Sequence, residues 1–306
     1  MLVNLKKVLV PARKKGYAVG AFNFNNWEFI QALLNSAESL RSPVIMQTSE
    51  GAVKYMGLEF IEAVAKEILK KTKVPVVLHL DHGKDLNLIK KIIKSGVYTS
   101  VMFDGSSLPY AENVKKTQAV VRLAHAKGMS VEAELGVLKG KEDNVSSNES
   151  HFTDPAQAAD FVKRTKCDAL AVAVGTSHGA YKFHGSAQLD LSRLRAIAKL
   201  VKIPLVLHGA SGVMPELLDK FQFGCEKIND CGRVAGAQGV PDGQIKEAIK
   251  LGVAKINIDT DLRLAFTSAV REKFLTDMKM IDPRDYLGAG RASVEEVVKA
   301  KIKLFS

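Results

Sequence analysis

Eight short apolar runs, separated by longer amphipathic segments, set the strongest limit on how this chain can fold. Most runs are too apolar to alternate between a buried and an exposed face, which is typical of parallel strands covered on both sides. Strands that alternate with helices predict right-handed β-α-β crossovers and a parallel sheet. The runs cover residues 19–24, 42–49, 75–82, 100–105, 130–136, 169–175, 204–211 and 255–260.

The segments between the runs have helical spacing, because their apolar residues recur at intervals of three and four with charges between them. Gly96, Gly128 and Gly252 follow such segments and suit helix ends. No Gly-x-Gly-x-x-Gly motif follows the first run, which disfavours an open doubly wound sheet. We therefore predict the α/β class and a single (β/α)8 TIM barrel over residues 1–306, a length that one barrel commonly reaches.

Composition indicates the class of protein and the cellular compartment to expect. Hydrophobic residues make up 46% of the chain and charged residues 25%, which is typical of a soluble globular protein. No apolar stretch is long enough for a membrane span, and the basic segment 1–17 lacks the apolar core of a signal peptide, so we expect a short first helix there. The three scattered cysteines, Cys167, Cys225 and Cys231, predict free thiols in the cytoplasm.

The formal net charge of +11 indicates an anionic partner, and nucleic acid, acidic membranes and phosphorylated metabolites all qualify. The chain has no run of five like charges and no interleaved basic and aromatic pattern. Charge alone therefore does not choose among these partners. Two segments lack periodicity: the polar segment 139–154 predicts a long loop after the fifth strand, and the glycine-containing segment 221–241 is expected to be irregular.

Polar residues are concentrated where the predicted strands end. All carboxyl ends of the strands in a parallel barrel lie on one face, so these residues are expected to meet around one mouth. Packing does not readily explain six polar strand ends, since buried polar groups need partners. The strand ends carry HLDHG at 79–83, Asp104, Glu132 with Glu134, GTSHG at 175–179, HGASG at 208–212 and NIDTD at 257–261.

Three histidines, His82, His178 and His208, lie at three of these strand ends. Imidazole is the commonest metal ligand, and three protein ligands with an open position describe a catalytic zinc site. The alternative is three separate histidines bonded to backbone carbonyls. The two-residue period of a strand places His79 with Asp81 and opposite His82 unless the strand turns, which Gly83 permits. We expect His79 in the core or behind the ligands.

Glu132 and Glu134 share one face of the fifth strand by the same period. Adjacent carboxylates facing a barrel interior repel each other unless a cation or a proton intervenes. Glu134 with Asp104 therefore predicts a second divalent metal position. For Glu132 a salt bridge to a barrel lysine is an equally open interpretation.

Glycines near the ends of the sixth and seventh strands indicate a phosphate site. Gly179, Gly209 and Gly212 allow the backbone to approach an anion closely. Pro215 is expected to open a helix whose N-terminus favours negative charge. Phosphate sites of barrels typically use the loops after strands seven and eight, where HGASG and NIDTD lie.

Together these motifs resemble those of class II fructose-bisphosphate aldolases. The resemblance implies a (β/α)8 barrel that forms a homodimer or homotetramer and acts as a zinc-dependent lyase of glycolysis. Its substrate would be a bisphosphorylated ketose, fructose 1,6-bisphosphate, cleaved reversibly to dihydroxyacetone phosphate and glyceraldehyde 3-phosphate. The matching stretches follow the family order over nearly the whole chain: GAFNF, QTSEGAVKYMG, LHLDHG, VEAELG, GTSHGAYK, PLVLHGASG, KINIDTDLR and DPRDYLG.

The resemblance also implies individual roles. His82, His178 and His208 would bind the catalytic zinc, and Asp104 and Glu134 would match the second metal position. Asp81 would take the proton of the C4 hydroxyl, and Glu142 would match a mobile acid that protonates the enediolate carbon. A monovalent cation, Na⁺ or K⁺, is implied near the phosphate. The residues implied in substrate binding are Asn23, Ser49, Gly179, Lys182, Gly209, Ser211, Asn257, Asp259, Thr260 and, in the neighbouring subunit, Arg284.

Three other functions remain open at this point. Lys255 on the eighth strand is positioned for Schiff-base chemistry on a ketone. Tagatose 1,6-bisphosphate, which differs at one stereocentre, is an alternative substrate for the same mechanism. A basic nucleic-acid-binding barrel without catalysis predicts salt-sensitive binding to DNA or RNA instead.

Overall fold

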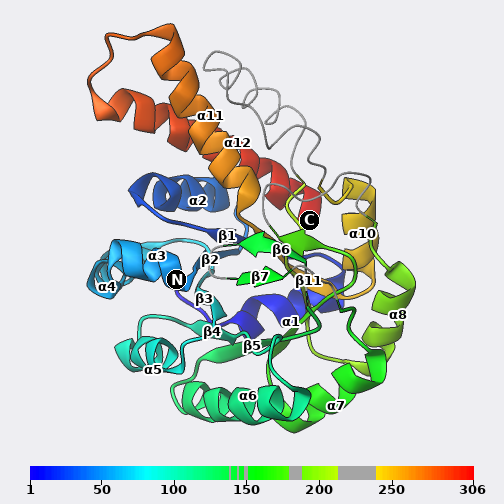
Figure 1. The fold of residues 1–306 in the computed structure, drawn as a ribbon. Coiled ribbons are helices and arrows are strands. Elements are labelled where there is room, and N and C mark those ends of the chain that lie inside the picture. Colours follow the sequence, from blue (N-terminus) through cyan, green and yellow to red (C-terminus); the bar gives the residue numbers. More distant parts are fainter. Residues whose placement is uncertain (138, 143–144, 148–150, 179–187, 213–238) are drawn as a thin grey trace.

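The eight predicted strands close into a parallel barrel (Figure 1). The structure is a computed structural model and describes residues 1–306 except 138, 143–144, 148–150, 179–187 and 213–238. The order around the barrel is β1-β11-β10-β8-β5-β4-β3-β2. The predicted (β/α)8 architecture is confirmed. The barrel strands are β1 (Val19–Asn23), β2 (Val44–Thr48), β3 (Val76–Gly83), β4 (Ser100–Phe103), β5 (Ser130–Leu135), β8 (Ala169–Val172), β10 (Leu205–Leu207) and β11 (Val253–Ile258).

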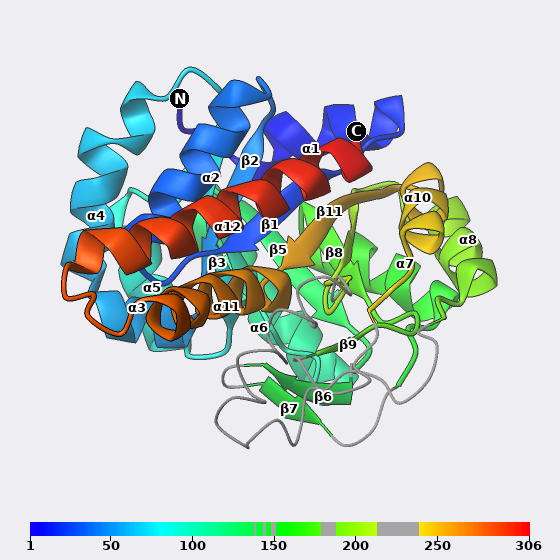
Figure 2. The ribbon, with the colours of Figure 1, turned by 90° about the horizontal axis from the view of Figure 1, so that it is seen from above.

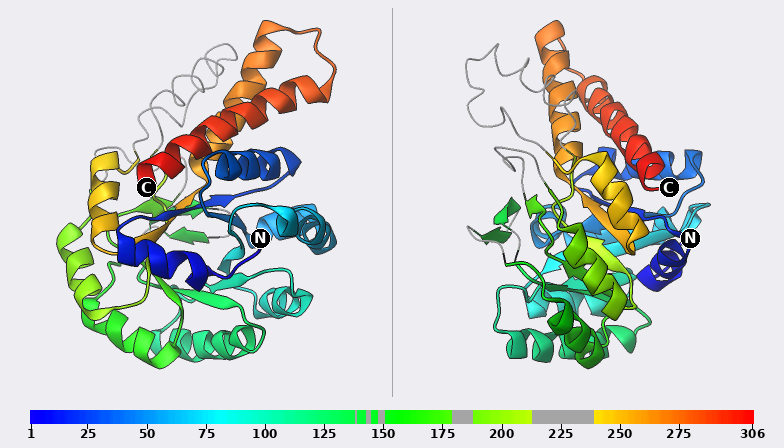
Figure 3. Two further views of the ribbon diagram at one scale, coloured as in Figure 1. Left: turned by 180° about the vertical axis from the view of Figure 1, so that it is seen from behind. Right: turned by 90° about the vertical axis from the view of Figure 1, so that its right-hand side faces the viewer.

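Helices surround the barrel and bury its outer face, as the views from the back and the side show (Figure 3). Asparagine, serine or aspartate caps several of them; for example, Asn26 accepts from the backbone N–H of Phe29. Gly96 ends its helix in the left-handed conformation, as predicted. The helices are α1 (Leu5–Lys15), α2 (Trp27–Ser39), α3 (Glu50–Met56), α4 (Leu58–Glu67), η1 (Leu69–Lys71), α5 (Leu86–Ser95), α6 (Tyr110–His125), α7 (Pro155–Thr165), α8 (Leu191–Leu200), α10 (Asp242–Lys250), α11 (Thr260–Thr276) and α12 (Pro283–Phe305).

The N-terminal end of the barrel is closed by α1, the predicted short first helix. One face of α1 packs against small apolar residues that point into the lower part of the barrel, which makes this end a dry core. The residues of this cluster are Leu5, Val8, Leu9, Ala12, Val19, Ala21, Ile45, Val77, Ala169, Ala171, Val206 and Ala254.

A small second sheet lies at the opposite end (Figure 2). In it β6 (Lys139–Glu142) pairs with β7 (Val145–Ser147) in antiparallel fashion and with β9 (Ser177–His178) in parallel fashion. The prediction of a long loop over 139–154 was therefore wrong in part. Polar strands that pair with one another need no apolar face, so the sequence pattern does not reveal them.

A helical hairpin formed by α11 and α12 projects from one side of the barrel (Figure 1). Most of the predicted irregular segment 221–241 lies outside the described residues, as does Pro215. None of the described helices combines the length and the apolar character that crossing a bilayer requires.

Candidate metal and substrate site

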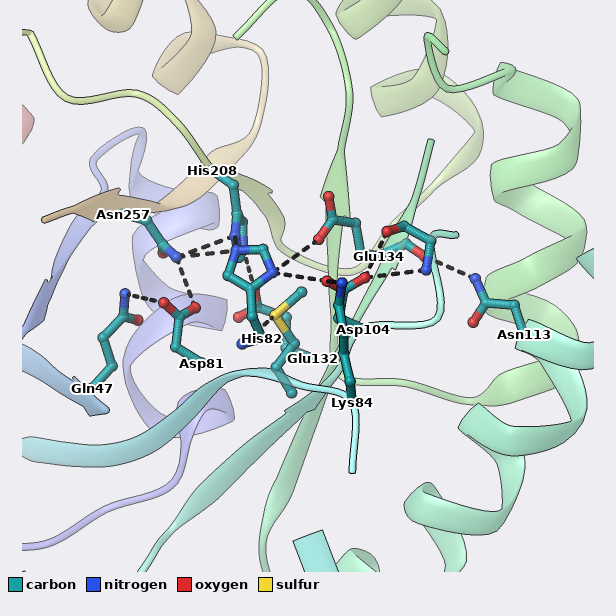
Figure 4. A network of polar contacts seen from close by, with 12 residues as sticks. Gln47, Asp81, His82, Lys84, Asp104, Asn113, Glu132, Glu134, His208 and Asn257 are labelled. Atoms are coloured by element: carbon teal, nitrogen blue, oxygen red, sulfur yellow. Dashed lines mark hydrogen bonds and ion pairs between the residues drawn. The ribbon is translucent and has the colours of Figure 1, made fainter. Parts of the chain in front are cut away.

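Two of the three predicted metal ligands meet at the C-terminal mouth of the barrel. His82 ends β3 and His208 follows β10, 126 positions later in the sequence. Nε2 of His82 lies 2.7 Å from Nδ1 of His208, and the two buried rings meet edge to face (Figure 4). Barrel closure therefore brings these two imidazoles to one point.

The far nitrogen of each ring faces a carboxylate. Nδ1 of His82 lies 3.0 Å from Oδ2 of Asp104, and Nε2 of His208 lies 2.7 Å from Oε1 of Glu132. Because carboxylate oxygens only accept, the far nitrogens donate to them, which leaves the two near nitrogens as the candidate metal-ligand atoms. Metal-ligating histidines typically have this arrangement, which fixes the tautomer and the ring orientation.

The donor atoms fit a zinc ion. Asp81, His82 and His208 offer ligand atoms within 4.8 Å of one another, and so do His82, Asp104 and Glu134. Imidazole nitrogens with carboxylate oxygens are a typical zinc donor set. The third predicted histidine, His178, lies in β9 and pairs through its backbone with Gly140, while its side chain lies outside the described part of the chain.

His82 reaches the mouth through an unusual backbone conformation. Its φ is 48°, in the left-handed region, and the β3–β4 register shifts between Leu80 and Gly83. This turn overrides the alternation that would separate His82 from Asp81. The strand turns here as Gly83 was expected to permit, although the residue in the left-handed conformation is His82 itself. Gly83 is needed for space: a Cβ there would lie 2.6 Å from the carbonyl oxygen of Met102.

Negative charge dominates around His82. Burial alone lowers the pKa of His82, but Asp81, Asp104 and Glu134 outweigh this effect and raise it to about 10. Burial, followed by repulsion from Asp104, holds the pKa of Glu134 well above its usual range. Among the described residues, Oε2 of Glu134 has no hydrogen-bond partner. A bound cation would balance this charge, which supports the predicted second position at Asp104 and Glu134.

Asp81 is held by three side-chain amides. Its Oδ2 accepts from Nδ2 of Asn23 and Nε2 of Gln47, both at 3.1 Å, and its Oδ1 accepts from Nδ2 of Asn257 at 3.0 Å. These three donors fix the orientation of the carboxyl group. The sequence interpretation missed Gln47. The sequence signal for Gln47 was a polar amide inside an otherwise apolar strand. In the structure Gln47 is in register with Asn23 on one side and His79 on the other.

A buried ion pair lies beneath the histidines. Nζ of Lys255 is 2.9 Å from Oε2 of Glu132, and both side chains are 0% exposed. This confirms the salt-bridge interpretation of Glu132. His79 is also fully buried, with Nδ1 2.9 Å from Oγ of Ser100 and Nε2 3.5 Å from Glu132. The expectation that His79 lies in the core behind the ligands is confirmed.

The predicted substrate residues fall into two groups. Those on or just after β1, β2, β10 and β11 lie buried around the mouth, and Gly209 adopts a left-handed φ of 60°. Arg284 instead begins α12 at the outer end of the hairpin, where its side chain is 88% exposed and pairs with Asp282. Gly179 and Lys182 lie outside the described residues. The mouth group comprises Asn23, Ser49, Gly209, Ser211, Asn257, Asp259 and Thr260.

Glu142 lies at the end of β6, where its backbone pairs with Val145 in the small second sheet. Its side chain lies outside the described part of the structure. The backbone position places this residue on the element that lies over the barrel mouth (Figures 1 and 2).

Comparisons with known proteins agree with this geometry. The family model described as "Fructose-bisphosphate aldolase class-II" matches residues 3–306. The chain is similar to the fructose-bisphosphate aldolase of Thermus caldophilus (49% identity over 100% of this chain and 98% of the relative). It is also similar to that of Giardia intestinalis (45% identity, 99% and 93%). The crystal structure of the YdjI aldolase from Escherichia coli superposes with a TM-score of 0.80 at 34% identity, covering 100% and 98% of the two chains.

Proposed function

Because this chain belongs to the class II fructose-bisphosphate aldolase family, we propose that it cleaves fructose 1,6-bisphosphate reversibly to dihydroxyacetone phosphate and glyceraldehyde 3-phosphate. The observation that carries the proposal is the convergence of His82 and His208, each backed by a carboxylate, beside Asp81. In this proposal residues 1–306 form one barrel domain of a cytoplasmic glycolytic enzyme.

The proposed metal centre uses His82, His178 and His208 as ligands. A zinc ion bound there supplies a Lewis acid that stabilises negative charge beside the substrate carbonyl. Asp104 and Glu134 are the proposed second divalent position, supported by Oε2 of Glu134, which has no hydrogen-bond partner among the described residues. A monovalent cation, Na⁺ or K⁺, is proposed near the phosphate.

Two carboxyl groups are proposed to move protons. Asp81 removes the proton of the C4 hydroxyl, since three amides orient its carboxyl group next to the histidines. Glu142 returns a proton to the carbon left after cleavage, from the strand that lies over the mouth. Closure of that element would exclude water from the reactive carbanion.

The substrate phosphates are proposed to bind at two places. The loops after β10 and β11 would hold the dihydroxyacetone phosphate half through backbone N–H groups and short side chains. Arg284 is highly exposed near the start of α12, so we assign it to the mouth of a neighbouring subunit in a homodimer or homotetramer. The proposed binding residues are Asn23, Ser49, Gly179, Lys182, Gly209, Ser211, Asn257, Asp259, Thr260 and Arg284.

Schiff-base chemistry on Lys255 is disfavoured by the geometry. Its ammonium is fully buried and held by Glu132 and by Oδ1 of Asn257 at 2.7 Å. A nucleophilic lysine must be neutral and must reach the ketone. Trapping with borohydride is therefore expected to leave Lys255 unmodified.

The proposal is tested by metal analysis of the purified protein together with cleavage assays on both bisphosphates. We expect about one zinc per chain, loss of fructose 1,6-bisphosphate cleavage on chelation and its return with added zinc. Cleavage that persists after complete metal removal would contradict the metal mechanism. Faster cleavage of tagatose 1,6-bisphosphate would assign the alternative substrate, and salt-sensitive DNA or RNA binding without cleavage would favour the nucleic-acid alternative.

A further inference from the structure

Lys255 is a fully buried cation that the proposed reaction does not use. It lies on β11, and its Nζ contacts Oε2 of Glu132 at 2.9 Å and Oδ1 of Asn257 at 2.7 Å. A buried ammonium must be compensated by such partners, because removing it from water is costly. A buried ammonium at this position therefore calls for a functional explanation.

Each partner of Lys255 leads to a different part of the site. Oε1 of Glu132 lies 2.7 Å from Nε2 of His208, so this branch ends on a proposed zinc ligand. Nδ2 of Asn257 donates to Oδ1 of Asp81 at 3.0 Å, so the other branch ends on the proposed base. Lys255 is therefore the common member of a continuous polar chain that joins the metal ligand to the base.

The ammonium of Lys255 determines how the side chains of Asn257 and Glu132 are oriented. An ammonium only donates, so Asn257 must turn its carbonyl oxygen to Lys255 and its NH₂ group to Asp81. The same ammonium pairs with Oε2 of Glu132, whose Oε1 accepts from Nε2 of His208. Without the ammonium, the amide of Asn257 is free to flip and Glu132 loses its closest cation.

We propose that Lys255 is a positioning residue that orients His208 through Glu132 and Asp81 through Asn257, and so couples zinc affinity to the alignment of the base. This inference rests on the proposed aldolase function. Lys255 touches neither the metal nor the substrate in this role and acts through its two partners.

The main test compares Lys255→Met with Lys6→Met. Lys6 forms an ion pair with the buried Asp168 at 2.8 Å at the opposite end of the barrel, so its variant controls for loss of a lysine–carboxylate pair. Zinc affinity is measured by chelator competition and cleavage of fructose 1,6-bisphosphate at saturating zinc. For Lys255→Met we expect zinc binding about 10- to 100-fold weaker, the usual effect of losing a group behind the ligands. We also expect a lower kcat that excess zinc does not restore, while Lys6→Met matches the wild type in both.

A second variant covers the case in which Lys255→Met fails to fold because Glu132 is left buried without its cation. The double variant Glu132→Gln, Lys255→Met removes both charges and is expected to fold, as judged by thermal unfolding. It should still bind zinc at least about 10-fold more weakly than the wild type. Lys255→Arg, which keeps a donor-only cation, should recover part of the zinc affinity.

Specific outcomes overturn the inference. Wild-type zinc affinity and kcat in either Lys255→Met or the double variant would do so. A borohydride-trapped substrate adduct on Lys255 of the wild type would make it a nucleophile instead. If the wild type itself binds no zinc or cleaves no bisphosphate, the proposed function fails first, so the two failures are distinguishable.

Discussion

Two buried carboxylates, Asp168 at the N-terminal end of the barrel and Glu134 at the C-terminal end, differ in how their charge is compensated. At the N-terminal end, Asp168 pairs with Lys6 and His125 and also accepts from the backbone N–H of Val131, so its charge is fully compensated. At the C-terminal end, Glu134 keeps an oxygen without a hydrogen-bond partner in the described structure and lies close to Asp104.

Backbone and packing repeat this contrast. The lower end is filled by apolar side chains of α1 and the strands, whereas the mouth holds His82 in the left-handed region. Strain and unbalanced charge persist only where the surrounding fold supports them, and they are concentrated at functional sites. The comparison indicates that the N-terminal end stabilises the barrel, whereas the C-terminal mouth is less stable and carries the chemistry. Substitutions at the N-terminal end should therefore change stability, and those at the mouth should change activity.

The largest effect is expected for His208→Ala at the mouth. Loss of a metal ligand removes Lewis-acid stabilisation of several kcal/mol, and ~5 kcal/mol corresponds to about a 10⁴-fold fall in kcat/KM. Glu132 keeps Lys255 as its partner, so the fold should survive. Cleavage assays and metal analysis of the variant check this. A variant with full zinc content and wild-type cleavage would show that His208 is not a ligand.

A somewhat smaller effect is expected for Asp81→Asn. The substitution keeps the shape of the side chain but removes the proton acceptor, so kcat should fall on the order of 10³-fold. Zinc content is expected to stay near that of the wild type. Loss of zinc together with activity would instead make Asp81 part of the metal site.

Substitutions at the N-terminal end should lower the stability of the protein and leave its activity unchanged. Leu9→Ala opens a cavity in the cluster between α1 and the strands, which should lower the free energy of unfolding by about 3 kcal/mol. Denaturant unfolding measures this loss. The activity per folded molecule and the zinc affinity should be unchanged, and a reduced kcat would show that the two ends are coupled.

The smallest effect is expected for Lys6→Met. The side chain of Lys6 is 59% exposed, and Asp168 keeps His125 and the N–H of Val131 as partners. The free energy of unfolding should therefore fall by less than about 1 kcal/mol. Thermal unfolding of the variant beside the wild type gives the difference, and a loss as large as that of Leu9→Ala would contradict this view of the lower end.

The barrel was predictable because each strand carries its own signal. The apolar runs are buried on both faces, and their polar ends meet at one mouth only because parallel strands point the same way. The positions of His208, Asp104 and Glu134 followed from this geometry, while the pairing of Glu132 with a barrel lysine was one of two open interpretations.

Features that depend on specific tertiary contacts were not predictable in the same way. The strand that pairs Gly140 with Ser147 is polar, and only its partners and its place over the mouth favour an extended form. The left-handed φ of His82 breaks the two-residue period, and the sequence showed only that Gly83 permits a turn there. Gln47 belonged to an apolar run, so its bond to Asp81 became visible only after the strands were in register.

The distance in sequence between His82 and His208 also links metal capture to the order of folding. One imidazole comes from the third barrel strand and the other from the seventh, so their nitrogens meet only after most of the barrel has assembled. A partly folded chain would hold zinc weakly, and an ion that binds only the native state at 100 times its Kd adds about 2.7 kcal/mol to the free energy of unfolding. Metal supply would thus help to decide how many newly made chains reach and keep the finished fold.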